Sequence, residues 1–123
     1  MDNKKKILII DDDNRNIFAL SAVLKAKGYL CVSALAAEEG LRLLKEQKDI
    51  AVVLMDMMMP GMDGYEAIAL MSADPELNHL PVIAVTAQAM VGDRERCLNA
   101  GASGYISKPV NVEQLTGLLV KYI

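Results

Sequence analysis

The sequence contains few of the residues that usually build zinc or thiol sites, since its 123 residues include one histidine and two cysteines. Cys31 and Cys97 lie far apart and match no metal-binding spacing, so we expect both to be reduced structural thiols. His79 lies in a polar loop with no catalytic partner near it in the sequence, and we expect it at the surface. A zinc centre is therefore not indicated.

Long apolar runs and an excess of basic charge are also missing. No apolar stretch approaches the roughly 20 residues that a membrane helix needs. The lysines at positions 4–6 precede a short apolar run that ends in acids, which is not the pattern of a signal peptide. The net charge of −3 gives no electrostatic footprint for nucleic acid. We therefore expect a cytoplasmic protein without membrane insertion or direct contact with nucleic acid.

A compact core is favoured by the hydrophobic content of 53%. A chain of this length buries roughly two-thirds of its unfolded surface, so we expect residues 1–123 to form one domain. Short apolar runs alternate with segments that have helical spacing. The predicted strands are 7–10, 29–33, 50–55, 82–85 and 104–107, and the predicted helices are 14–27, 37–47, 65–72, 89–99 and a last one after Asn111. This alternation predicts an α/β fold with a parallel sheet covered by helices on both faces.

Acidic residues follow two strongly apolar predicted strands. The run ILII ends in three aspartates, and the run IAVVLM leads Asp56 into the turn MMMPGMDG. Right-handed crossovers place the carboxyl ends of parallel strands along one edge of the sheet, where such folds bind ligands. We therefore expect Asp11, Asp12 and Asp56 to meet at this edge, together with Thr86 and Lys108, which follow later strands.

Converging carboxylates are costly unless a cation joins them. Two carboxylates ~4 Å apart repel by roughly 4 kcal/mol at an effective dielectric constant near 20, which is large beside a domain stability of about 5–15 kcal/mol. An oxygen-only set without histidine or cysteine favours Mg²⁺ or Mn²⁺ over zinc. The predicted ligands are Asp11, Asp12 and Asp56. Asp13 either adds charge beside them or caps the following helix.

Asp56 is the best-placed nucleophile of this set. A carboxylate that attacks phosphorus needs a metal, with cationic or hydroxyl donors around the transferring group. Lys108 and Thr86 supply such donors, so the constellation predicts formation of an aspartyl phosphate. Taken alone, Thr86 also fits an ordinary strand residue and Lys108 a solvated charge, although the proline after Lys108 favours a positional role.

Four stretches in the correct order resemble the receiver domains of two-component response regulators. They are residues 7–12, residues 54–56 with 59–64, residues 81–87 and residues 104–109. The resemblance covers essentially the whole chain and implies a doubly wound, flavodoxin-like sheet of order 2-1-3-4-5. The stretch DDDNRN is most similar to single-domain or hybrid-kinase receivers. No output domain fits within 123 residues, so any output requires a protein partner or further sequence.

The resemblance implies that Asp56 accepts a phosphoryl group from a phosphohistidine of a histidine kinase or a histidine phosphotransfer protein. It also implies that Mg²⁺ (or Mn²⁺) is held by Asp11, Asp12, Asp56 and the backbone carbonyl of Met58. Such a chain would catalyse only its own phosphorylation and dephosphorylation, and would otherwise act as a switch rather than an enzyme.

Further roles are implied for residues that end the fourth and fifth predicted strands. Thr86 would hydrogen-bond the phosphoryl group, Lys108 would pair with it, and the small Ala87 would leave space for it. Tyr105 matches an aromatic residue that moves with Thr86 on phosphorylation, although it also fits a half-buried strand residue whose hydroxyl meets water. A cis bond before Pro109 would aim the lysine inward.

Two other functions are weighed against this one. A small Mg²⁺-dependent phosphatase of the haloacid-dehalogenase type would use Asp11 as nucleophile and Asp13 as its partner. That family has Thr or Val where this chain has Arg15, and it usually carries a cap for which this chain is too short. A flavin or nucleotide module needs a phosphate-binding loop after the first strand, whereas this loop is acidic and repels phosphate.

Overall fold

The computed structural model describes residues 5–87 and 90–123. Within these residues, strands and helices alternate along the chain. They are β1 (Lys6–Ile10), α1 (Asn14–Ala26), β2 (Leu30–Ala34), α2 (Ala37–Glu46), β3 (Ile50–Asp56), α3 (Gly64–Ala73), β4 (Val82–Thr86), α4 (Asp93–Ala100), β5 (Gly104–Ser107) and α5 (Val112–Leu119). The described strands form one parallel sheet in the order β2-β1-β3-β4-β5, which confirms the predicted fold class and strand order.

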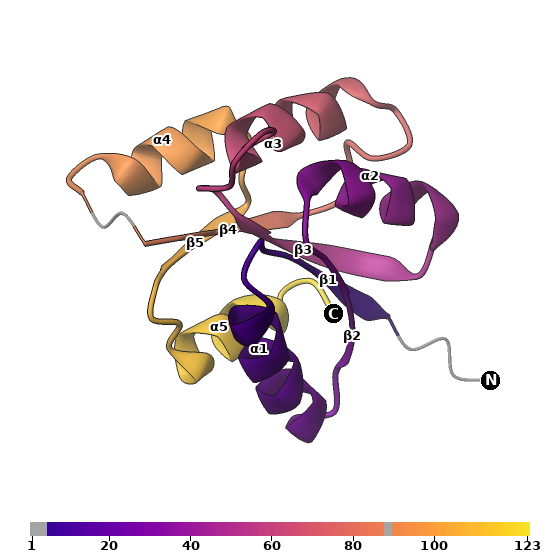
Figure 1. Ribbon diagram of the computed structural model, residues 1–123, viewed down its shortest axis with the longest axis vertical. Helices are drawn as coiled ribbons and strands as arrows, with labels where there is room; N and C mark the ends of the chain where they lie inside the picture. Colours follow the sequence, from indigo (N-terminus) through magenta and orange to yellow (C-terminus); the bar gives the residue numbers. More distant parts are fainter. Residues whose placement is uncertain (1–4, 88–89) are drawn as a thin grey trace.

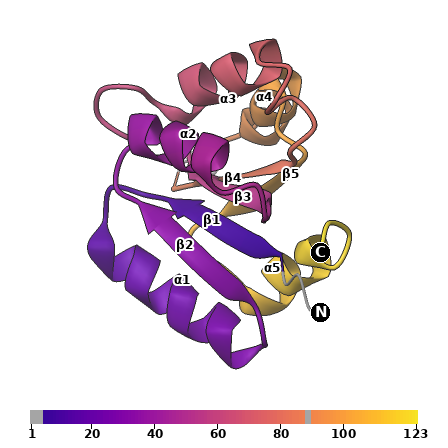
Figure 2. The ribbon, with the colours of Figure 1, turned by 90° about the vertical axis from the view of Figure 1, so that its right-hand side faces the viewer.

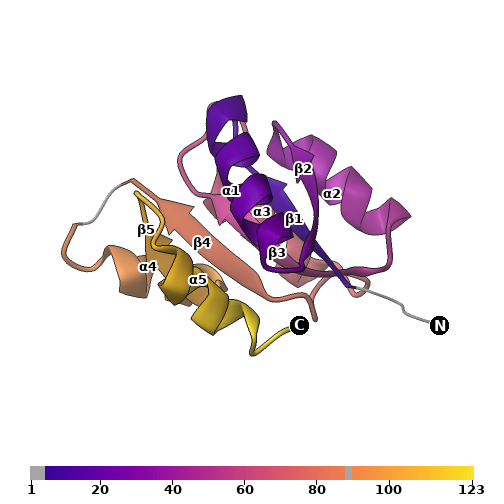
Figure 3. The same ribbon diagram turned by 90° about the horizontal axis from the view of Figure 1, so that it is seen from below.

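Helices cover both faces of the sheet. Helices α2, α3 and α4 lie on one face, and α1 and α5 lie on the other (Figures 1 and 2). Figure 3 views the molecule from the side of α1 and α5, which lie in front of the sheet. In the part of the chain that the structure describes, no helix combines the length and the apolar character needed to cross a membrane.

The sheet separates two hydrophobic clusters. Successive side chains of a strand point to opposite faces, so a strand covered on both sides must be apolar throughout. In β3, Val53 and Met55 face the cluster under α2, α3 and α4, whereas Val52 and Leu54 face the cluster under α1 and α5. The continuous apolar runs in the sequence therefore correspond to strands that are buried on both faces.

Side-chain caps fix where several helices begin. The Asp13 carboxylate accepts a hydrogen bond from the Arg15 backbone N–H at the start of α1. Asp63 forms a capping box with Glu66 at the start of α3, and Asn111 caps α5 as predicted. The expected role of Asp13 as a helix cap is thus confirmed.

Some predicted boundaries were wrong. Strands β3 and β4 each extend one residue further than expected, so Asp56 and Thr86 are the last residues of their strands. Helix α4 begins at Asp93, because Gly92 before it has a φ of 88°, which is not a helical conformation. The predicted start at residue 89 lies outside the described residues. In α5, Leu118 lies three residues after the buried Leu115 but is itself only partly buried.

Candidate functional site

The carboxyl ends of β1 and β3 bring three aspartates together. Asp11, Asp12 and Asp56 each offer a carboxylate oxygen, and these atoms lie within 4.8 Å of one another. Asp11 and Asp56 are buried, with 3% and 4% of their surfaces exposed, whereas Asp12 is exposed. β1 and β3 are neighbours in the sheet, and Ile10 pairs with Met55 immediately before the acids. The pairing of these strands therefore produces the predicted cluster.

Backbone amides orient the two buried carboxylates. The Met58 N–H donates to the Asp56 Oδ1 atom over 3.0 Å, and the Asp13 N–H donates to the Asp11 Oδ1 atom over 2.9 Å. Each bond spans two residues and needs a turn directly after the strand, which the sequence supplies in both places. In both residues the Oδ2 atom is the one that faces Lys108.

Lys108 bridges the two buried aspartates. Its Nζ atom lies 3.2 Å from the Asp11 Oδ2 atom and 3.5 Å from the Asp56 Oδ2 atom. Its backbone N–H donates to the Thr86 carbonyl over 2.8 Å, which joins the ends of β4 and β5. The peptide bond between Lys108 and Pro109 is cis, as the family resemblance implied. The lysine therefore reaches the carboxylates from the position directly after β5, an edge strand of the sheet.

Burial and charge shift the ionisation of this pair. Burial, with a smaller contribution from the nearby Asp11 carboxylate, raises the pKa of Asp56 from 3.8 to about 6, although the Met58 amide opposes the change. Burial alone would lower the pKa of Lys108. The nearby Asp56 and Asp11 carboxylates have the larger combined effect and raise this pKa above its ordinary value. Lys108 is therefore a cation at neutral pH. Asp56 is mostly ionised at neutral pH, and its carboxylate is more basic than that of an exposed aspartate.

The cluster fits a hard divalent cation. It offers oxygen donors from three carboxylates, two of them buried, as Mg²⁺ and Mn²⁺ prefer. Lys108 supplies one positive charge toward three negative ones, so net negative charge remains to attract a cation. Participation of the Met58 carbonyl stays a prediction.

Other predicted site residues lie along the same edge. Thr86 is buried at the end of β4, where it pairs with Ser107 of β5. Ala87 follows it in an exposed bend. Tyr105 lies further back on β5 and pairs with Ala84. The sheet therefore brings Thr86 and Lys108 to the edge that carries the acids and sets Tyr105 back from it.

Tyr105 has a partner that the sequence analysis missed. Its side chain is half-buried as expected, but its hydroxyl donates a hydrogen bond of 2.8 Å to the Asp93 Oδ2 atom. Burial and this bond raise the pKa of Tyr105 to about 12. Asp93 itself is buried, with 7% of its surface exposed. In the sequence it was an ordinary acid within a predicted helix, and nothing distinguished it from the exposed Glu95.

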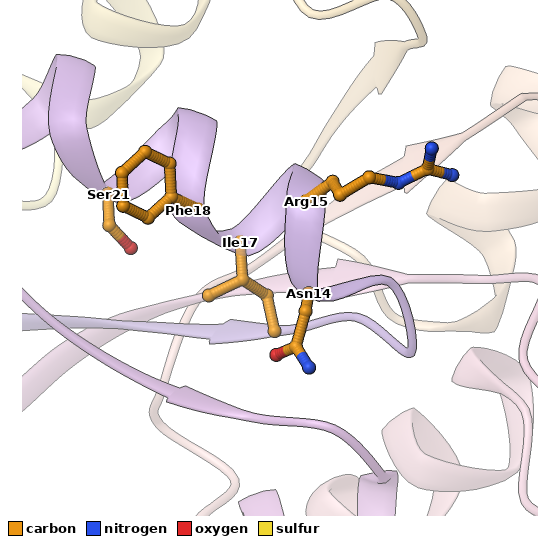
Figure 4. A pocket seen from close by; sticks show the side chains of 5 residues that line it. All are labelled: Asn14, Arg15, Ile17, Phe18 and Ser21. Atoms are coloured by element: carbon orange, nitrogen blue, oxygen red, sulfur yellow. The ribbon is translucent and has the colours of Figure 1, made fainter.

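A hollow of about 550 Å³ lies along α1. It is lined by Asn14, Arg15, Ile17, Phe18 and Ser21, and Figure 4 shows Arg15 extending away from the other side chains. The Phe18 side chain is strongly exposed, at 77%. None of the clustered aspartates lines this hollow, so it is separate from the carboxylate site.

Comparison with known proteins gives a consistent result. Residues 7–120 match the response regulator receiver domain. The polar-differentiation response regulator DivK of Brucella ovis is 35% identical over 119 residues, which cover 97% of this chain and 96% of the relative.

Solved structures agree with this match. A response regulator receiver protein from Pseudomonas putida has a TM-score of 0.90 at 28% identity, covering 98% of this chain and 99% of that one. A chain in the co-crystal structure of the Saccharomyces cerevisiae histidine phosphotransfer protein Ypd1 with the receiver domain of Ssk1 has a TM-score of 0.86 at 23% identity, covering 97% and 88%. The second likeness concerns the fold alone.

These matches do not favour the alternative of a haloacid-dehalogenase-type phosphatase. That alternative needs Asp13 as a partner of the nucleophile, whereas the Asp13 carboxylate caps α1 and pairs with the Arg15 side chain. Receiver domains are signalling switches of two-component systems rather than conventional enzymes. With the parallel sheet, the aspartate cluster and the match over residues 7–120 in agreement, this chain belongs to the response regulator receiver domain family.

Proposed function

We propose that this chain is a phosphorylatable switch whose phosphoacceptor is Asp56. The observation that supports the proposal is the bridge from Lys108 to Asp56 and Asp11 at a cluster of three carboxylates. A carboxylate that is buried, oriented by a backbone amide and paired with a lysine suits attack on a phosphoryl group. Residues 1–123 would act as one receiver domain, in the cytoplasm.

The proposed reaction transfers the phosphoryl group from a phosphohistidine to Asp56. An Asp56 oxygen forms a bond to phosphorus while the bond between phosphorus and the histidine nitrogen breaks, and the imidazole leaves with that electron pair. The Met58 amide holds the Oδ1 atom, so the Oδ2 atom is the oxygen that faces the lysine and the incoming group. Mg²⁺ would be held by Asp11, Asp12 and Asp56, and would neutralise charge on the phosphoryl oxygens.

Neighbouring residues have proposed supporting roles. Lys108 already points at Asp56 and would pair with the new phosphoryl oxygens. Thr86 ends the adjacent strand and would donate its hydroxyl, while the small side chain of Ala87 leaves room beside it. The phosphodonor would be a histidine kinase or a histidine phosphotransfer protein. The co-crystal structure with Ypd1 supports the second class, because its fold matches this chain.

The test is the intact mass of the protein after incubation with Mg²⁺ and acetyl phosphate. We expect the wild type to gain one phosphoryl group and Asp56→Asn to gain none. Asp13→Asn is the matched control, because it removes a nearby carboxylate but keeps a side chain that caps α1 well. It should label like the wild type.

Two further arms sharpen the result. EDTA should abolish labelling of the wild type if the carboxylates act with a divalent cation. Labelling of Asp56→Asn at the wild-type rate would assign the phosphoacceptor to another residue and contradict the proposal.

A further inference from the structure

Exposed thioether groups are concentrated at the edge of the sheet that carries the aspartates. All methionines except Met1 lie within the described residues, and of these only Met58 and Met90 are exposed, at 50% and 70%. Met58 lies in the turn after β3, and Met90 lies in the segment between β4 and α4. The other described methionines are buried or partly buried, namely Met55, Met57, Met59, Met62 and Met71. A dissolved oxidant therefore meets Met58 and Met90 before any other methionine that the structure describes.

The two cysteines compete poorly for such an oxidant. Cys97 has no exposed surface, and Cys31 is half-buried in β2. Burial raises the pKa of both thiols above the ordinary value. Peroxide reacts with the thiolate rather than with the thiol, so both cysteines are protected. The exposed thioethers are thus the sulfur groups that peroxide reaches first.

The backbone places Met58 beside the nucleophile of the proposed reaction. The preceding Met57 is still held by the sheet, since its N–H donates to the Val85 carbonyl over 3.0 Å and its side chain is buried beside Gly64. Met58 is the first residue after β3 whose side chain is exposed. Its N–H donates to the Asp56 Oδ1 atom over 3.0 Å. The exposed thioether therefore belongs to the residue that orients the proposed phosphoacceptor.

Met90 has the same chemistry in a different setting. It follows β4, the neighbour of β3 in the sheet. Its backbone carbonyl accepts a 3.0 Å hydrogen bond from the Asp93 N–H, which ties it to the start of α4. Met90 is therefore a matched control for Met58, because it is at least as open to an oxidant.

We propose that Met58 is an oxidation site through which peroxide slows the phosphorylation of Asp56, a regulation that rests on the proposed function. Hydrogen peroxide transfers one oxygen atom to the Met58 sulfur, which gives up two electrons and becomes a sulfoxide, and the peroxide is reduced to water. A methionine sulfoxide reductase reverses the step with a dithiol. The sulfoxide oxygen then leaves as water, and the dithiol is oxidised to a disulfide.

The sulfoxide changes the polarity of the entrance to Asp56. A thioether is apolar, whereas a sulfoxide is polar and its oxygen carries partial negative charge. The oxygens of an incoming phosphoryl group are also negative, so this partial charge repels them as they approach Asp56. The Met58 side chain already lies half in water, so the fold accommodates the added oxygen without repacking its core.

Peptide mass spectrometry of the full chain after limited treatment with hydrogen peroxide tests the site itself. We expect one added oxygen atom on Met58 and one on Met90 before any on the buried Met55, Met57 or Met59. Oxidation of these buried methionines or of a cysteine ahead of Met58 would refute the assignment.

Labelling with Mg²⁺ and acetyl phosphate tests the link to Asp56. The rate of each protein after peroxide is divided by its own rate before peroxide, so that differences in basal rate do not enter. Wild type and Met90→Leu should slow by about fivefold or more, whereas Met58→Leu, which has an apolar side chain without sulfur, should not slow. A methionine sulfoxide reductase with dithiothreitol should restore the rate of the oxidised wild type.

The opposite patterns contradict the proposal. If Met58→Leu slows as much as the wild type, the effect of peroxide arises at another residue. If Met90→Leu is the variant that resists peroxide, the sensitive residue is Met90.

Met58→Gln tests whether the sulfoxide acts through its polarity. Glutamine places a carbonyl oxygen near the position of the sulfoxide oxygen, so the untreated variant should label more slowly than untreated Met58→Leu. Equal rates in these two variants would sink the polarity argument and the proposal with it. If the untreated wild type gains no phosphoryl group, the proposed function of Asp56 fails, and the peptide masses still decide whether Met58 is oxidised first.

Discussion

Asp56 must satisfy two opposing demands, and both can be measured. It is buried beside another carboxylate, which favours its protonated form, yet the proposed attack on phosphorus requires it to be ionised. Its pKa of about 6 lies close enough to neutrality for ionisation in the cell while keeping the oxygen more basic than that of an exposed aspartate. The hydrogen bond from the Met58 N–H and, to a smaller extent, the Lys108 ammonium oppose the effect of burial on this pKa.

A first prediction concerns the pH dependence of stability without metal. The Asp56 pKa rises from 3.8 to about 6 on folding, so the folded protein binds this proton more tightly than the unfolded chain. The resulting stabilisation is complete below pH 3.8 and is lost as the pH rises through about 6. In EDTA, lowering the pH from 7 to 5 should raise the contribution of Asp56 to the free energy of unfolding by about 1 kcal/mol.

Asp56→Asn is the control for this effect. It should be more stable than the wild type at pH 7 in EDTA by about 2 kcal/mol, because the ionised buried carboxylate is removed. The asparagine oxygen can still accept the hydrogen bond from the Met58 N–H. Urea titrations at pH 7 and pH 5 measure both quantities. If the wild type and the variant respond identically to pH, Asp56 does not carry the shifted pKa.

Site residues could be predicted from the sequence where they lie at or directly after the end of a strand. Asp11, Asp12, Asp56 and Lys108 were all predictable, since parallel topology alone brings strand ends together. The role of Asp93 as a partner of Tyr105 was not, because it depends on where α4 begins and which of its faces meets β5. Helical spacing cannot distinguish a buried acid from an exposed one in the first turn.

At the scale of elements, the contact between α3 and the end of β3 sets the position of Asp56, the proposed phosphoacceptor. Gly64, the first residue of α3, packs directly on the end of β3. A Cβ atom there would lie 2.8 Å from the Met57 Cα atom and 3.1 Å from the Asp56 carbonyl oxygen. Because Gly64 has no side chain, the start of α3 can pack closely against the backbone of Asp56 and Met57.

Gly64→Ala should consequently damage both stability and labelling. The collision is with backbone atoms, which relax poorly, so we expect a loss of about 1–3 kcal/mol in the free energy of unfolding. Labelling by acetyl phosphate should slow in parallel because Asp56 is displaced. Chemical denaturation and timed intact-mass spectra measure the two effects.

Gly117→Ala provides the matched comparison in α5. No atom lies within 4 Å of a Cβ atom at that position, so alanine should stabilise the helix by about 0.5–1 kcal/mol without changing labelling. If Gly64→Ala were as stable as Gly117→Ala, the backbone at the end of β3 would have moved to accommodate the new Cβ atom at little cost, which would contradict this prediction.

Element types were easier to predict than element ends. Nearly continuous apolar runs identified β1, β3 and β4, and apolar residues at helical spacing identified α1, α2 and α5. The start of α4 was wrong because the sequence before Asp93 has no capping side chain and Gly92 adopts a left-handed conformation that pattern alone does not show. Leu118 fits the apolar face of α5 by spacing but lies at the margin of the core.

At the scale of the whole molecule, the carboxylate cluster couples metal binding to stability. The folded chain brings Asp56 to Asp11 and Asp12, which lie far from it in the sequence, and the unfolded chain does not, so Mg²⁺ should stabilise the fold. At a hundredfold excess over its Kd the gain is about 2.7 kcal/mol, which corresponds to a rise in Tm on the order of 10 °C for a domain of this size. Thermal scans with Mg²⁺ and with EDTA measure it.

The variant Asp12→Asn distinguishes two effects of the acidic cluster on stability, the binding of Mg²⁺ and the repulsion among carboxylates when no metal is bound. Its response to Mg²⁺ should be weaker than that of the wild type, while its Tm in EDTA should be equal or higher because one negative charge is gone. The gain in EDTA should be smaller than for Asp56→Asn, because Asp12 is exposed and its charge is screened by water. A fall in Tm in EDTA would contradict the picture of clustered acids.

The division of the core into two clusters by the sheet has a consequence for how such a chain can diversify. The side chains under α1 and α5 belong to one cluster and those under α2, α3 and α4 to the other, so the two faces share a backbone but few side-chain contacts. One face can accumulate substitutions and acquire a new recognition surface while the other keeps its packing. After gene duplication, one copy can therefore change the binding partner recognised by one face and keep the partner recognised by the other.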